Sequence, residues 1–211
     1  MRPLAILGVF SSVLAAQPFS FGVKVGVRAT DDLDTVFATS ESKRYVVGPM
    51  VTARLLLGFR LEFDALYRRI GYRYSDSDII GDFFSVRQRG NSWEFSILVR
   101  RTFWRGVYAG TGYVTRVING HGHESAVVVN NPYTIPPFRQ FFESYPPGEW
   151  QTTHGVLGVA GIEKRAGPLH IAPEVRYTYW TQPALQFYGS HGFTLLSSQH
   201  QVDLLVGITF P

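Results

Sequence analysis

Hydrophobic and polar residues alternate at every second position along much of this sequence. In the stretch 19–29, five apolar residues share one parity, and the intervening positions include Lys24 and Arg28. A period of two places successive side chains on opposite faces of an extended chain, so the stretch predicts a β-strand with one apolar and one polar face. The closing stretch 200–211 has the same alternation, with Asp203 between Val202 and Leu204.

Eight stretches of this kind predict eight strands, at 19–29, 44–56, 59–69, 92–103, 107–117, 150–163, 170–180 and 200–211. The two faces are clear at 59–69 and 92–103, whereas glycines blur them at 107–117 and 150–163. Pro49 is a weak point in the second strand because proline cannot donate to the ladder. Most stretches reach ten residues, and strands of globular proteins average only about five or six.

The connections between these strands alternate in length. Tight turns are predicted at 57–58, 105–106 and 164–168, and long polar loops at 29–43, 75–90, 118–149 and 181–197. Long loops at one end and short turns at the other are typical of an up-and-down barrel. The longest loop is rich in proline and aromatic residues, and we expect it to fold over the barrel mouth.

Aromatic residues concentrate near the predicted strand ends, where they would form two girdles. The girdle at the short-turn end would contain Phe19, Phe59, Phe103, Trp104, Tyr108 and Phe210. The girdle at the long-loop end would contain Tyr45, Tyr67, Tyr72, Trp93, Trp150, Tyr177, Tyr179 and Trp180.

The polar faces of the predicted strands carry both signs of charge, and we expect these side chains to form a network in the lumen of a closed barrel. The predicted network is Lys24, Arg28, Arg54, Arg60, Glu62, Asp64, Arg68, Glu94, Arg100, Glu174, Arg176 and Asp203. Eight strands enclose a space just wide enough for side chains, so this network would plug the barrel. Asp203 is expected to pair with Lys24 or Arg28, because the first and last strands meet when the barrel closes. In a soluble barrel the same face would instead be solvated.

The first residues read as a secretory signal peptide. Arg2 precedes an uncharged apolar run that ends at Ala15 and Ala16, and the run is too short to span a bilayer. We therefore expect a signal peptide at 1–16 and one β-barrel domain at 17–211. The chain has no cysteine, which excludes disulfides, and its 20 Lys and Arg against 16 Asp and Glu are scattered rather than clustered as in nucleic-acid-binding proteins.

With these features the chain resembles the eight-stranded outer-membrane β-barrel domain family of the OmpA and OmpX type. The resemblance covers the leader, the strand count, the loop order and the aromatic close "VDLLVGITF", although Pro211 follows the final aromatic. It implies a closed antiparallel transmembrane barrel in the outer membrane of a Gram-negative bacterium. It also implies contact with outer-membrane lipid and lipopolysaccharide and insertion by the barrel-assembly machinery. We expect a monomer.

No set of residues predicts an enzyme. His121, His123, Glu124 and Ser125 fall in a glycine-rich part of the longest loop, and the acidic residues Asp76, Asp78 and Asp82 fall in another loop. We therefore name no catalytic residue, metal ligand or cofactor, and we expect a structural or surface-interaction role. The alternatives are a lipid-A-modifying enzyme of the outer membrane and a soluble, lipocalin-like secreted barrel that binds a ligand.

Overall fold

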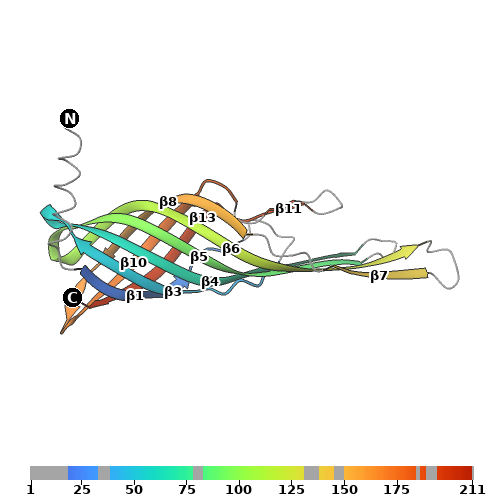
Figure 1. Cartoon of the computed structure of the whole chain (residues 1–211), viewed down its shortest axis with the longest axis horizontal. Coiled ribbons are helices and arrows are strands. Elements are labelled where there is room, and N and C mark those ends of the chain that lie inside the picture. The colour runs from blue at the N-terminus through green and yellow to red at the C-terminus, as the bar shows by residue number, and fades with distance from the viewer. Residues whose placement is uncertain are drawn as a thin grey trace, which may run out of the picture.

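The computed structural model describes residues 19–32, 39–77, 83–130, 138–144, 150–183, 186–188 and 194–210. These residues form a barrel from which a narrow sheet projects at one end (Figure 1). The predicted signal peptide at 1–16 lies outside the described residues. Within the described ranges, no helix has the length and apolar content that crossing a membrane requires.

Eight long strands make the barrel wall. They are β1 (Phe19–Arg28), β3 (Tyr45–Arg54), β4 (Phe59–Ser77), β5 (Phe83–Thr102), β6 (Val107–Asn130), β8 (Trp150–Ile162), β10 (Leu169–Trp180) and β13 (His200–Phe210). Each pairs antiparallel with the next in this order, and β13 pairs with both β10 and β1, which closes the ring. The predicted all-β, closed, eight-stranded up-and-down barrel is confirmed.

Short elements connect or extend the wall strands. They are β2 (Thr39–Ser40), β7 (Phe138–Ser144), β9 (Lys164–Ala166), β11 (Gln186–Tyr188), β12 (Thr194–Leu196) and the single 3₁₀ turns η1 (Leu56–Gly58) and η2 (Trp104–Gly106). The tight turns predicted at 57–58 and 105–106 are confirmed. Both use two left-handed residues in succession, with φ of 61° and 77° at Leu57 and Gly58 and 57° and 83° at Arg105 and Gly106. Glycine adopts this conformation without a steric penalty, which explains its place at the end of each turn.

The alternation in the sequence becomes an alternation between the outside and the lumen of the barrel. Asp203 is completely buried, whereas the next residue, Leu204, is 46% exposed. The same pattern holds along β1, where Lys24 and Arg28 are buried while the valines between and beside them are exposed. Charged side chains therefore fill the interior, and the outer wall is apolar.

Most of the predicted girdle residues lie on the outer wall, but three do not. Tyr72, Tyr108 and Trp180 are buried, with exposures of 2%, 0% and 1%. Their parity along the strand explains this, because Trp180 follows Arg176 and Thr178 on the inward face of β10. Tyr108 fits inside because its neighbour on β8 is Gly161, where a Cβ atom would lie only 2.6 Å from the tyrosine hydroxyl oxygen. The side chain of Trp150 lies outside the described residues.

Two of the predicted long loops are wrong in extent. β4 and β5 remain paired as far as Ser77 opposite Phe83, so the described residues of the predicted loop 75–90 belong to these two strands. β6 continues to Asn130 and pairs there with β7. Polar residues favour a loop in the sequence, but a ladder needs only backbone N–H and C=O groups, so polar strands can extend it. The result is the sheet that projects from the barrel in Figure 1.

Candidate functional site

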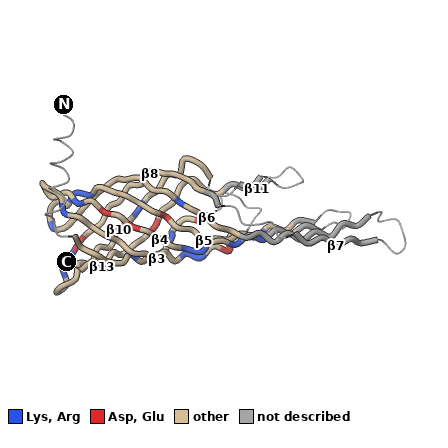
Figure 2. Tube along the Cα trace, viewed as in Figure 1, with Lys and Arg blue, Asp and Glu red and all other residues tan. Residues whose placement is uncertain are grey.

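The lumen contains seven basic and seven acidic side chains among the described residues. Figure 2 shows basic and acidic positions interleaved along the barrel wall. The basic set is Lys24, Arg28, Arg60, Arg68, Arg100, Arg116 and Arg176, and the acidic set is Asp32, Glu62, Asp64, Glu94, Glu163, Glu174 and Asp203. The formal charges of these fourteen side chains cancel.

The central cluster, which joins opposite sides of the barrel, consists of Lys24, Glu62, Asp64, Glu174 and Arg176. The Lys24 Nζ lies 2.5 Å from Glu62 Oε1, 2.9 Å from Glu174 Oε1 and 3.3 Å from Asp64 Oδ2. The Arg176 Nη2 donates to Asp64 Oδ2 at 2.5 Å. Because β4 and β10 are four strands apart in a ring of eight, the Arg176 to Asp64 pair crosses the whole lumen.

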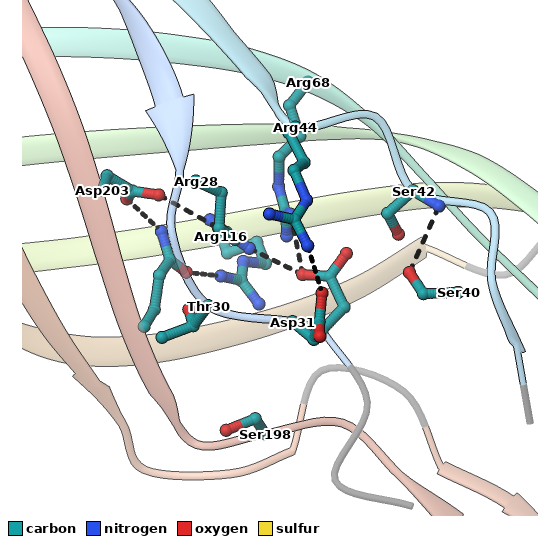
Figure 3. Close-up of polar contacts among 12 residues, drawn as sticks. Arg28, Thr30, Asp31, Ser40, Ser42, Arg44, Arg68, Arg116, Ser198 and Asp203 are labelled. Carbon is teal, nitrogen blue, oxygen red and sulfur yellow. Dashed lines mark hydrogen bonds and ion pairs between the residues drawn. The ribbon is translucent and has the colours of Figure 1, made fainter. Parts of the chain in front are cut away.

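The loop-side cluster contains the carboxylate of Asp203. The Arg28 Nε donates to Asp203 Oδ1 at 3.0 Å, and the same guanidinium reaches Glu94 at 3.0 Å and Asp32 at 2.8 Å. Arg116 binds Glu94 from β6, and Arg28, Arg116 and Asp203 lie close together in Figure 3. Arg28 lies opposite Asp203 on neighbouring strands, and Arg116 lies opposite Glu94 in the same way, whereas the contact from Arg28 to Glu94 joins strands that are not neighbours.

Asp32 closes this cluster from the loop above the barrel wall. The Arg68 Nη1 donates to its Oδ1 at 2.7 Å, beside the bond from Arg28. Burial acts to raise the pKa of Asp32, but the charges of Arg68 and Arg28 outweigh it and hold the pKa well below the ordinary value. Asp32 is therefore ionised at neutral pH, and it completes the charge balance of the loop side. A small pocket of about 110 Å³ opens beside it.

The turn-side cluster is built around Glu163, between β8 and β9. Arg60 Nη1 lies 2.6 Å from its carboxylate, Arg100 Nη2 lies 3.3 Å away and His170 Nδ1 lies 2.8 Å away. Burial acts to raise the pKa of Glu163, but the hydrogen bond from Arg60 and the charges of Arg60 and Arg100 lower it. The cluster continues inward, because Arg100 also contacts Glu62 at 3.2 Å.

Apolar side chains fill the space beside these clusters. Leu98, Tyr108, Val114, Leu157 and Trp180 are buried together on the inward faces of β5, β6, β8 and β10. The Trp180 ring lies 3.8 Å from the Arg116 guanidinium carbon, and its Nε1 donates to Gln201 at 2.9 Å. Ion pairs and aromatic packing thus occupy the lumen together, as expected for a barrel of eight strands.

Eleven of the twelve residues predicted for the lumen network lie in one of the three clusters. The exception is Arg54, which is exposed because it is the last residue of β3, where the barrel wall ends. The prediction missed Arg116, Asp32 and Glu163. Arg116 shares the parity of Val114 in a stretch whose glycines obscured the faces, while Asp32 and Glu163 lie in connections, where no alternation exists.

The three clusters consist of ion pairs that link strands of the barrel to one another. The buried carboxylates are paired with cations, and no group of three potential metal ligands occurs among the described residues. His154 is exposed on the outer wall beside Tyr113, whereas His170 contacts Glu163. The side chains of His121, His123, Glu124 and Ser125 and of the acidic loop 76–82 lie outside the described residues.

No protein-family model and no curated protein matches this chain. Among solved structures, Ail, the attachment invasion locus protein of Yersinia pestis in complex with the heparin analogue sucrose octasulfate, aligns over 92% of this chain and 96% of its own. The TM-score is 0.39 and the identity 9%. The neisserial surface protein A, NspA, aligns over 91% of this chain and 95% of its own, with a TM-score of 0.36 and 11% identity. These scores are too low to support an inference about function.

Proposed function

We propose that this protein is a small, non-conducting outer-membrane β-barrel with a structural or surface-interaction role. The observation that supports the proposal is the reversed distribution of polarity. Charged side chains such as Lys24 and Asp203 are buried in the lumen, while large apolar side chains such as Phe21 and Leu204 are exposed around the wall. A soluble barrel has the opposite distribution, because water would make such a wall costly.

The exposed apolar wall has the form of a membrane-spanning band. Exposed aromatic residues bound it at both ends, with Phe103, Trp104 and Phe210 at the short-turn end and Tyr45, Trp93 and Tyr179 at the other. The strands are long enough to cross a bilayer when tilted, and their closure leaves no unpaired edge within the band. These features favour the outer membrane of a Gram-negative bacterium over the periplasm.

The filled lumen favours a structural role over transport. The central cluster crosses the full width of the barrel, and its Arg176 to Asp64 pair lies in the path that water and ions would have to take. The sheet that continues β4, β5 and β6 beyond the barrel offers a surface on the long-loop side for contact with other molecules. We also propose that the chain is exported with a cleaved signal peptide, inserted by the barrel-assembly machinery and monomeric.

The test is cell fractionation combined with heated and unheated gel electrophoresis. The proposal predicts recovery in the outer-membrane fraction and a mobility that changes on heating, because a folded barrel resists detergent at low temperature. Recovery in the soluble periplasm without a mobility change would overturn it in favour of the lipocalin-like alternative. A changed mass of lipid A in cells that overproduce the protein would instead favour the enzyme alternative.

A further inference from the structure

The outer face of the barrel changes from apolar to polar at one level on β4 and β5. Tyr67 and Trp93 lie opposite each other there, with ring centroids 5.1 Å apart. The Tyr67 hydroxyl donates to Asn91 Oδ1 at 2.8 Å, so the tyrosine is apolar toward the turn side and polar toward the loop side. If the wall spans the membrane as proposed above, this pair marks the upper edge of the hydrocarbon layer.

Immediately beyond this edge the same outward face becomes basic. Arg69 lies opposite Asn91, and two residues further along, Arg89 lies opposite Gly71. The segment before β3 runs alongside, because the N–H groups of Lys43 and Glu41 donate to the carbonyls of Arg69 and Gly71 at 2.9 and 2.8 Å. Residues paired across antiparallel strands project from the same face, so two strands and this connecting segment contribute side chains to one surface.

These side chains line a pocket of about 350 Å³, formed by Glu41, Lys43, Arg69, Ile70, Arg87 and Arg89. We call Lys43, Arg69, Arg87 and Arg89 the outer basic patch. Glu41 holds Arg87 Nε at 2.8 Å and Arg89 Nε at 3.3 Å. Within the described part of the chain, no carboxylate lies within ion-pairing distance of Lys43 or Arg69. Four cations and one carboxylate leave the pocket with a net charge of three positive units.

We propose that the outer basic patch binds the phosphate groups of a phosphorylated glycolipid in the outer leaflet, the lipopolysaccharide that surrounds the barrel. The inference rests on the proposed outer-membrane location and adds a site and a ligand class to it. The first row of the patch lies two residues beyond the Tyr67 and Trp93 level, which corresponds to about 5 Å of height for a tilted strand. Lipid phosphates lie at this height, just outside the hydrocarbon.

The chemistry of the patch matches that ligand. Guanidinium groups bind phosphate oxygens through two parallel hydrogen bonds, and Glu41 holds two of the three arginines in place before a ligand arrives. Arg69, Arg87 and Arg89 share the outward parity of Tyr67 and Trp93, so the patch lies on the side of the barrel that faces lipid in the proposed location. A lipid headgroup reaches it by lateral diffusion, whereas a soluble polyanion would have to displace neighbouring lipids.

The experiment compares the refolded full chain with two charge-matched variants. The patch variant carries Lys43→Gln, Arg69→Gln and Arg89→Gln. The control carries Arg101→Gln, Arg105→Gln and Lys164→Gln, which remove the same charge from exposed positions at the short-turn end. Each protein is placed in phosphatidylcholine vesicles, its insertion is verified by heat-dependent mobility, and binding of bisphosphorylated lipid A and of dephosphorylated lipid A is titrated by tryptophan fluorescence.

The proposal predicts that the unmodified protein prefers the phosphorylated lipid and that the patch variant binds it about tenfold more weakly. The control variant should bind it within about twofold of the unmodified protein. Equal loss in both variants, or no preference for phosphate, overturns the site while leaving the proposed barrel function intact. Failure of the unmodified protein to insert overturns both proposals. Displacement of the lipid by a soluble sulfated oligosaccharide at equal charge concentration would overturn the assignment to a lipid.

Discussion

A charge placed on the outer wall of β13 should destabilise the barrel according to its depth in the membrane. The outward residues of this strand are, in order, Val202, Leu204, Val206, Ile208 and Phe210. Tyr177 lies opposite Val202, and Phe21 lies opposite Phe210, so the two aromatic levels enclose this series. We predict that a substitution to arginine at the centre of the series lowers the unfolding free energy more than one near either end.

The expected magnitude follows from the strand geometry. Eight residues at about 3.4 Å each, tilted by about 40°, span about 21 Å of membrane thickness. Val206 then lies about 10 Å from either edge, and Val206→Arg should cost about 2–4 kcal/mol of unfolding free energy. Leu204 lies only about 5 Å below the loop-side edge, so its arginine can extend toward the interface and should cost about 1–2 kcal/mol.

The assay is urea unfolding of the refolded proteins in phosphatidylcholine vesicles, followed by tryptophan fluorescence under reversible conditions. Asp203→Asn is the control for a change on the inward face. Asp203→Asn should lower the unfolding free energy by about 1–3 kcal/mol, since Arg28 keeps Glu94 and Asp32 as partners. If Leu204→Arg costs as much as Val206→Arg, or if neither differs from the unmodified protein, then the outer wall does not face a bilayer.

Three further predictions concern the lumen. Arg116→Met should lower the unfolding free energy by about 3 kcal/mol in the same assay, because it removes a cation that contacts buried Glu94. A loss below the error of the titration would show that Arg28 and Arg68 are enough to neutralise Glu94. Since the folded state lowers the pKa of Glu163, its contribution to stability is present above the ordinary value of 4.5 and is lost as the pH falls through the lowered value. Glu163→Gln should therefore lower the unfolding free energy at neutral pH, and this free energy should fall less below pH 4.5 than it does in the unmodified protein. The measurement is unfolding at a series of pH values. An equal fall in both proteins would contradict the prediction. Purified protein in planar bilayers should show no stable channel, and reproducible large current steps would contradict the filled lumen.

The sequence predicted the barrel well because its strongest signal, a period of two, is the signal that determines which face meets the lumen. Along β1 and β13 the alternation assigns every inward position, and Lys24, Arg28 and Asp203 are buried where it places them. The strand count and the tight turns follow from the same signal combined with glycine positions.

What the sequence did not predict depends on contacts outside that alternation. Asp32 and Glu163 enter the clusters from connecting segments, whose direction is set by the folded chain rather than by periodicity. The continuation of β4 and β5 beyond the barrel resembles a loop in the sequence, because its residues are polar and the ladder that stabilises it depends on backbone pairing. Arg54 shows that alternation alone can also mislead, because a side chain at the end of a wall strand stays exposed whatever its parity.

The pairing of Arg176 with Asp64 has a mechanical consequence. A ring of strands that are joined only to their neighbours can flatten by changing the angles between strands, without losing a ladder hydrogen bond. Here the ion pair joins β10 to β4 across the full diameter, and Lys24 links β1 to both of these strands. Any deformation of the circular cross-section into an ellipse would lengthen at least one of these ion pairs. The circular cross-section is therefore held by the buried charges as well as by the wall, and it should resist sideways pressure from crowded neighbours in the membrane.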